Sequence, residues 1–224
     1  MQEEDILKEI RNKFCHVNAC PFSGKRIFFE NAGGSLTLKS VAKRSGELAA
    51  IPDNQGRDNS GSKGVMDFIR KSKTDALEFF NTEKGSIIIG ESGTELLFRL
   101  IRAVILDSDK GTVVGSTLEH PASRSAATKW SAHASKHLIL VPHCKETGSV
   151  KIDQYLDRIT PDVGVATIVH TSPVTGIGVK IKELTQGIKR ISPDCFIIVD
   201  GIQHAPHGDI NISDYPIDGY VISP

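Results

Sequence analysis

Short runs of apolar, mostly β-branched residues alternate along this chain with longer amphipathic segments. Strands that are apolar on both faces, with amphipathic helices between them, are typical of a parallel sheet that helices cover on both sides. We therefore expect an α/β fold with a doubly wound, mostly parallel sheet. Its expected strands are residues 87–89, 112–114, 138–141, 165–169, 196–199 and 220–222.

The part of the chain ahead of this pattern is expected to be mainly helical. Its periodicity predicts helices over residues 3–13, 36–50 and 65–81, and a short apolar run predicts a strand over 27–29. Residues 53–64 are polar and rich in glycine, which predicts a loop. Loops of this length are more often functional than idle.

Composition and charge exclude several classes of function. The 224 residues carry 27 Lys and Arg against 27 Asp and Glu, so the net charge is zero and nothing favours nucleic acid as a partner. The apolar runs are much shorter than the roughly 20 residues that span a bilayer, and the acidic start is unlike a secretory signal. The four cysteines lack Cys-x-x-Cys spacing, which argues against a disulfide framework or a zinc ribbon. We expect a cytoplasmic protein that does not contact membranes.

Polar side chains that could bind a ligand or take part in catalysis follow the expected strands. In open parallel sheets, ligands bind beyond the carboxyl ends of the strands, where helix N-termini gather. Ser92-x-x-Glu95 forms a capping box there, which satisfies some of the N–H groups that a phosphate would use. A single histidine at such an end is more often structural than catalytic, but the joint occurrence of these groups indicates a site. The residues at these ends include Ser92, Gly93, Thr94, His120, His170, Asp200, Gln203, His204 and Ser223.

A metal centre is one alternative interpretation of this region. Asp200, His204, His207 and Asp209 fall within ten residues, and His120 or His170 could complete the zinc or dinuclear site of a metal-dependent hydrolase. The intervening proline and glycine suggest an irregular segment without a fixed helical face. In addition, the spacing of these residues matches no zinc signature.

Several motifs occur in order along the chain. They are Glu-Asn-Ala-Gly-Gly at 30–34, Ser-Gly-Thr-Glu at 92–95, Glu-His at 119–120, His-Thr-Ser at 170–172 with Gly176, Val-Asp-Gly-Ile-Gln at 199–203 and Ala-Pro-His-Gly at 205–208. In these motifs the sequence from about residue 28 to 224 resembles the class V aminotransferases of pyridoxal phosphate enzymes, which include cysteine desulfurases and selenocysteine lyases. The last motif is most similar to the cysteine desulfurase-like branch. The resemblance implies the large domain of a fold type I enzyme, with residues 1–26 as an N-terminal helical arm and 27–224 as an incomplete cofactor-binding domain that lacks the small C-terminal domain.

The resemblance also implies a role for each site residue. Asp200 would keep the pyridine nitrogen of pyridoxal 5′-phosphate protonated, and His120 would stack on the ring and relay a proton, so these are the expected catalytic residues. Gln203 would donate a hydrogen bond to the phenolic oxygen of the ring. Gly93 and Thr94 would bind the phosphate at a helix N-terminus, and Ser223 would add a hydroxyl. Asn31, Arg57 and His204 are the expected substrate contacts.

Two features depart from the family pattern. Pro173 stands where relatives carry an asparagine, so one usual hydrogen bond near the ring oxygen is missing. The Schiff-base lysine is expected just beyond Pro224, and no lysine of this sequence matches it. We therefore expect a pyridoxal phosphate-dependent transferase or lyase that acts on an amino acid, and a chain that is catalytically weak or inactive in isolation.

A non-catalytic partner subunit of the same fold is a second alternative. Family members are usually homodimers in which both subunits contribute residues near each cofactor, so we expect a homodimer here. The loop over 53–64, with Arg57 and Lys63, would be the element that crosses between subunits. The sequence leaves open which amino acid is the substrate, and whether the reaction is that of a desulfurase, lyase, transaminase or epimerase.

Overall fold

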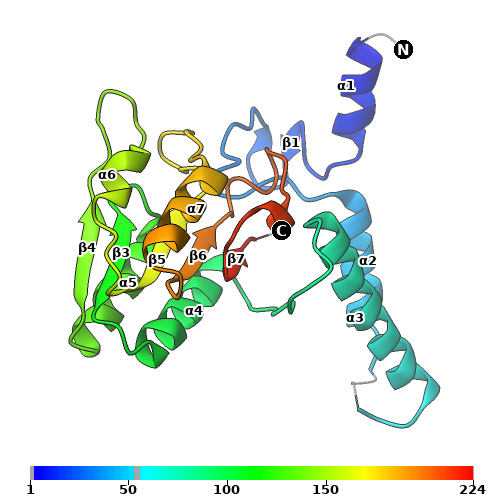
Figure 1. The fold of residues 1–224 in the computed structure, drawn as a ribbon. Coiled ribbons are helices and arrows are strands. Elements are labelled where there is room, and N and C mark those ends of the chain that lie inside the picture. The colour runs from blue at the N-terminus through cyan, green and yellow to red at the C-terminus, as the bar shows by residue number, and fades with distance from the viewer. Residues whose placement is uncertain (1–2, 53–55, 224) are drawn as a thin grey trace. The chain divides into compact units, whose positions relative to one another are not determined.

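The structure, a computed structural model, describes residues 3–52 and 56–223. The chain divides into two compact units, residues 1–72 and 73–224. Helix α3 (Ser60–Phe79) carries the chain from the first unit into the second (Figure 1). The sequence-based division at residue 27 stays a prediction, because it concerns the role of the segments and not their packing.

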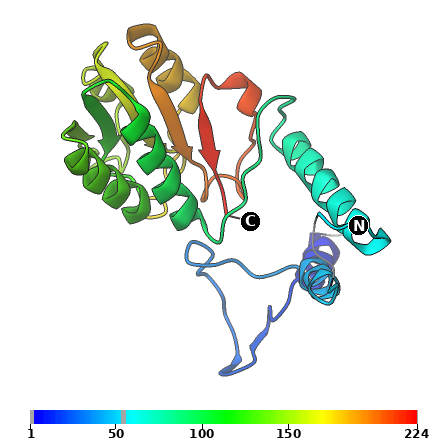
Figure 2. The same cartoon turned by 90° about the horizontal axis from the view of Figure 1, so that it is seen from below.

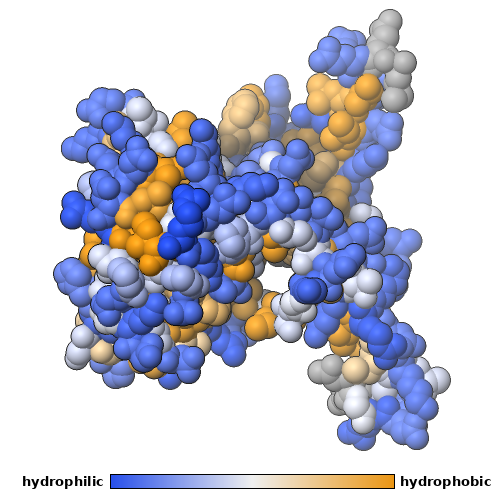
Figure 3. Space-filling view, in the orientation of Figure 1, coloured by the Kyte–Doolittle hydropathy of each residue, from blue (hydrophilic) through white to orange (hydrophobic). Residues whose placement is uncertain are grey.

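The N-terminal unit consists of helices and one small hairpin. It contains α1 (Glu3–Asn12), the antiparallel strands β1 (Ala19–Cys20) and β2 (Gly24–Lys25), α2 (Lys39–Ala49) and the first part of α3. Along α1 the apolar side chains of Ile6, Leu7 and Ile10 are exposed, and Figure 3 shows apolar atoms at the surface of this helix. The helices predicted over residues 3–13 and 36–50 are confirmed with small changes at their ends.

Two predictions for this unit are wrong. Residues 27–29 do not form a strand, because no segment of the described chain pairs with them, and Ile27 and Phe29 are exposed. The loop predicted over 53–64 is shorter than expected, because α3 already begins at Ser60. The Asn59 side chain accepts a hydrogen bond from the Ser62 N–H at 2.7 Å and so starts the helix early. Residues 53–55 of that loop lie outside the described residues.

The C-terminal unit is built on a five-stranded parallel sheet, which confirms the predicted fold class. The strands lie in the order β4-β3-β5-β6-β7, and each neighbouring pair is parallel. Figure 2 shows helices on both faces of this sheet. The strands are β3 (Thr112–Ser116), β4 (His137–Val141), β5 (Val163–Val169), β6 (Phe196–Asp200) and β7 (Gly219–Val221), and a short 3₁₀ helix (Ile212–Asp214) precedes β7.

Each face of the sheet has its own apolar core. Helices α4 (Gly93–Asp107) and α5 (Pro121–His133) pack on one face, and α6 (Ile152–Leu156) and α7 (Ile181–Ile191) pack on the other. All seven residues of β5 are buried, as expected for a central strand between two helical layers. This burial holds the carboxyl ends of the strands in a fixed arrangement.

One predicted strand of this unit is absent. Residues 87–89 are extended but join no ladder in the described part of the chain, and Ile88 and Ile89 are 75% and 74% exposed. An apolar β-branched run favours a strand only where a partner strand can pair with it.

No helix among the described residues is long and apolar enough to cross a membrane.

Candidate functional site

The carboxyl ends of the parallel strands bring a buried carboxyl group and an imidazole together. Asp200 is the last residue of β6 and is 5% exposed, and its Oδ1 accepts a hydrogen bond from the Ile202 N–H at 3.2 Å. Burial raises the pKa of Asp200, while the Ile202 N–H and the nearby His120 oppose this rise. A cation placed beside this carboxyl group would therefore stabilise its ionised form.

His120 reaches the same rim from the start of α5. It is the N-cap of that helix, and its ring Nδ1 accepts a hydrogen bond from the Ala122 N–H at 3.1 Å. Because Nδ1 accepts a hydrogen bond, the ring proton is on Nε2. Pro121 follows at the first helical position, where its missing N–H costs nothing. The local sequence thus fixes both the position and the tautomer of the imidazole.

The N-terminus of α4 lies beside the loop that follows β6. Ser92 caps this helix by accepting a hydrogen bond from the Glu95 N–H at 3.1 Å, as the capping box predicts. The N–H groups of Gly93 and Thr94 precede the hydrogen-bond ladder of the helix, so the helix itself cannot pair them. A Cβ on Gly93 would lie 2.4 Å from Cδ1 of Ile202 and 3.7 Å from Cβ of Ser223. Glycine is therefore the residue that fits at this close approach.

Both ring nitrogens and one ring face of His204 contact other residues of the chain. Its Nδ1 lies 2.9 Å from Thr171 Oγ1, and its Nε2 lies 3.2 Å from the carbonyl oxygen of Asp209. Its ring stacks on that of His170, with the centroids 3.4 Å apart and the planes at 15°. Gln203, half-buried, precedes it in the same turn. With both nitrogens engaged, His204 is better suited to hold this loop than to bind a substrate.

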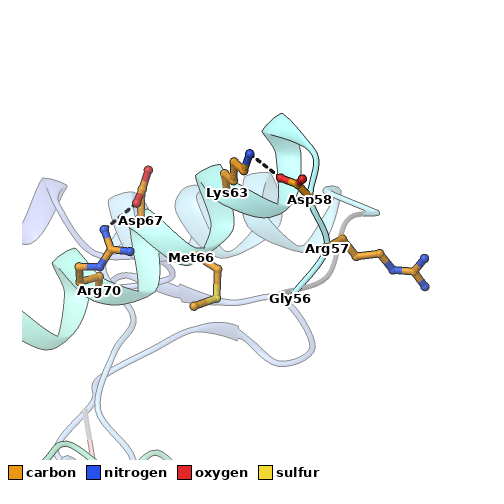
Figure 4. A pocket seen from close by; sticks show the side chains of 7 residues that line it. All are labelled: Gly56, Arg57, Asp58, Lys63, Met66, Asp67 and Arg70. Atoms are coloured by element: carbon orange, nitrogen blue, oxygen red, sulfur yellow. Dashed lines mark hydrogen bonds and ion pairs between the residues drawn. The ribbon is translucent and has the colours of Figure 1, made fainter.

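Asn31 and Arg57 belong to the N-terminal unit. Asn31 is exposed in a turn. Arg57 lines an open pocket of about 300 Å³ together with Gly56, Asp58, Lys63, Met66, Asp67 and Arg70. Figure 4 shows the Arg57 side chain directed away from the two ion pairs of this pocket. Those pairs join Lys63 to Asp58 at 2.5 Å and Arg70 to Asp67 at 2.8 Å, so most of the pocket's charge is already neutralised.

The structure also reveals site residues to which sequence reasoning gave no role. Glu119 is 4% exposed, and its Oε1 accepts hydrogen bonds from Ser116 Oγ at 3.1 Å and from the Val169 N–H at 3.0 Å. Burial, and then the charge of Asp200, raise the pKa of Glu119 to about 8. The position of Glu119 directly before His120 was its one sequence signal.

Tyr220 is the second such residue. Its hydroxyl lies 2.8 Å from His170 Nδ1, and burial raises its pKa well above the usual value for tyrosine. In the sequence Tyr220 was visible only as part of an apolar strand, so no signal there pointed to this contact.

The metal alternative finds no support in this geometry. Among residues 3–52 and 56–223, no group of three or more His, Cys, Asp and Glu side chains is arranged to hold a metal ion. Both ring nitrogens of His204, a central member of the suggested cluster, already have partners within the chain.

A family model and the curated relatives of this chain agree with one another. Residues 27–224 match the model of the family described as aminotransferase class-V. The chain is 28% identical over 199 residues to a probable cysteine desulfurase of Mycoplasma genitalium, covering 86% of this chain and 47% of that protein. It is 28% identical over 214 residues to the cysteine desulfurase-like protein ustD of Aspergillus flavus, covering 89% of this chain and 47% of that protein.

Solved structures show the same fold. The apo cysteine desulfurase of Thermococcus onnurineus superimposes with a TM-score of 0.82 at 18% identity, over 100% of this chain and 53% of that one. A NifS-like protein superimposes with a TM-score of 0.81 at 15% identity, over 88% of this chain and 55% of that one. The chain thus spans about half the length of each of these relatives.

Proposed function

We propose that this chain, which belongs to the aminotransferase class-V family, forms the cofactor platform of an enzyme that acts on an amino acid as a transferase or lyase. The cofactor of this family is pyridoxal 5′-phosphate. When bound, this cofactor withdraws electrons from the substrate and so stabilises a carbanion at its α-carbon. Because the chain spans about half of its relatives, the activity, the amino-acid substrate, a homodimer and a cytoplasmic location are proposals for the whole protein.

The observation that carries this proposal is the buried Asp200 beside His120. A buried carboxylate without a cation is unfavourable, and this is the cause of the raised pKa of Asp200. A protonated pyridine nitrogen would supply the missing positive charge, and the ionised Asp200 would in turn keep that nitrogen protonated. The donor set at this rim therefore fits the cofactor.

The phosphate group would be bound at the start of α4. The N–H groups of Gly93 and Thr94 lie at the positive end of the helix dipole, which favours an anion. Ser223 lies next to Gly93 and would add its hydroxyl group. Only glycine fits at position 93, because a larger side chain there would collide with Ile202.

The remaining roles follow from position. His120, with its proton on Nε2, would cover the ring and move a proton, and Gln203 would donate a hydrogen bond to the phenolic oxygen. Asn31 and Arg57 are proposed as contacts to the substrate. Both ring nitrogens of His204 have partners within the chain, so His204 is not proposed as a contact to the substrate.

A titration with pyridoxamine 5′-phosphate tests this function. This compound carries the ring and the phosphate but no aldehyde, so it cannot react with lysines at the surface. We expect saturable binding to the chain in calorimetry, and at least about tenfold weaker binding by Asp200→Asn, because a charge-assisted hydrogen bond contributes roughly 1.5–3 kcal/mol.

Asp209→Asn is the matched control, since Asp209 is an exposed carboxylate of the same loop. A chain that is folded by circular dichroism but binds no pyridoxamine phosphate would contradict the proposal. Equal binding by Asp200→Asn and by the unchanged chain would contradict the role of Asp200.

A further inference from the structure

Three strand ends are joined at His170. Its backbone N–H donates to the carbonyl oxygen of Asp200 at 2.8 Å, which ties the end of β5 to the end of β6. Its ring Nδ1 lies 2.8 Å from the hydroxyl of Tyr220 in β7. Its ring also stacks on that of His204 in the loop after β6. Through one residue, the loop that carries Gln203 is connected to three neighbouring strands.

The hydrogen-bond partners of His204 indicate its tautomer. The carbonyl oxygen of Asp209 can only accept, so Nε2 of His204 donates to it. In the neutral ring Nδ1 of His204 then accepts from the Thr171 hydroxyl. Burial, followed by the neighbouring His204, lowers the pKa of His170 to about 3. The two rings therefore stack without a positive charge on His170.

Two glycines make room for this arrangement. A Cβ on Gly208 would lie 2.4 Å from Cε1 of His204, and a Cβ on Gly201 would lie 2.2 Å from ring carbons of Tyr220. The backbone of the loop thus passes directly against both rings. The N–H groups of Ala205 and Gly208 donate to the carbonyl oxygens of Gly201 and His204, at 2.9 Å each, so the loop is a pair of tight turns with the His204 ring at its centre.

We propose that the stacked rings of His170 and His204 clamp residues 201–209 onto the strand ends and thereby position Asp200 and Gln203 for the cofactor. This inference rests on the proposed function. His204 is accordingly a positioning residue that acts through the loop, and the clamp consists of His170, Thr171, His204 and Tyr220.

Hydrogen exchange and cofactor binding together test the clamp. In the chain without cofactor, we expect His204→Ala to speed amide exchange in segment 201–209 by about tenfold or more, because it removes two hydrogen bonds and a stacked ring. In the titration with pyridoxamine 5′-phosphate, we expect the same variant to bind about tenfold more weakly. His204→Phe retains the stack but not the hydrogen bonds, so it should recover part of both effects.

His207→Ala is the matched control, because His207 is an exposed histidine of the same loop. It should leave exchange and binding unchanged. Unaltered exchange in His204→Ala overturns the clamp, whether or not the chain binds the cofactor. Faster exchange with unaltered binding overturns its positioning role. Failure of the unchanged chain to bind contradicts the proposed function instead, while the exchange data still decide whether the clamp exists.

Discussion

Glu119 and Asp200 are two buried carboxyl groups with different surroundings. Glu119 lies in the turn between β3 and α5 and accepts a hydrogen bond from the N–H of Val169, the residue that is in register with Asp200. The charge of an ionised Asp200 disfavours the ionised form of Glu119, so we expect one of the two groups to stay protonated at neutral pH. With a pKa of about 8, Glu119 is that group. Its neutrality leaves Asp200 free to ionise beside a cation.

This assignment predicts the pH dependence of stability. A carboxyl group whose pKa rises from 4.5 to about 8 on folding stabilises the folded chain fully below pH 4.5, and this stability is lost as the pH rises to about 8. Glu119→Gln mimics the protonated group at every pH. We therefore expect its free energy of unfolding to decline less than that of the unchanged chain between pH 5 and 8, by on the order of a few kcal/mol.

Urea denaturation at a series of pH values measures this difference. Glu83→Gln, at an exposed glutamate, is the control and should retain the slope of the unchanged chain. The same slope in Glu119→Gln would show that Glu119 is ionised in the folded chain.

At the scale of single elements, two glycines in different surroundings should respond in opposite ways to the same substitution. Gly201 follows β6, and a Cβ added to it would lie 2.2 Å from ring carbons of Tyr220. A Cβ added to Gly46 in α2 would have no atom within 4 Å. We expect Gly201→Ala to lower the stability of the chain by about 1–3 kcal/mol, because a packed ring must move. We expect Gly46→Ala to raise the stability of α2 by roughly 0.5–1 kcal/mol, because alanine favours a helix.

Thermal unfolding followed by circular dichroism compares the two variants. A stabilising Gly201→Ala would mean that the ring of Tyr220 is not packed against this turn. A destabilising Gly46→Ala would mean that α2 does not present this position to solvent.

The element scale also shows what the sequence can predict. The apolar, β-branched run at 165–169 favours a strand that is buried on both faces, so most of β5 was predictable from the sequence, and all seven of its residues are buried. Residues 87–89 are also apolar and β-branched, yet they join no ladder in the described part of the chain, because pairing depends on a second segment that a local pattern does not contain. Likewise Asp200 and His120 could be found at strand ends, but the contact of Tyr220 with His170 depends on the register between β6 and β7.

At the scale of the whole molecule, the charge balance predicts solubility. The chain has a formal net charge of zero at pH 7 and a sequence pI of about 7.1. Self-repulsion between molecules is weakest at that point. We expect a solubility minimum near pH 7 in polyethylene glycol precipitation, with higher solubility at pH 6 and at pH 8.5. A steady rise or fall across this range would show that a local patch and not the net charge controls association.

The chain contains one tryptophan, Trp130, and its position in α5 determines which part of the chain its fluorescence reports on. The Cζ atom of Arg102 and the Nζ atom of Lys129 lie 5.0 and 5.3 Å from the centre of the Trp130 ring. The centre of the Phe98 ring lies 5.8 Å from it. All of these residues belong to the unit of residues 73–224. Intrinsic fluorescence therefore follows the unfolding of the sheet unit, whereas circular dichroism also records α1 and α2. Coincident curves from the two signals would mean that the helices of the N-terminal unit melt together with the sheet, and separate curves would mean that they melt independently.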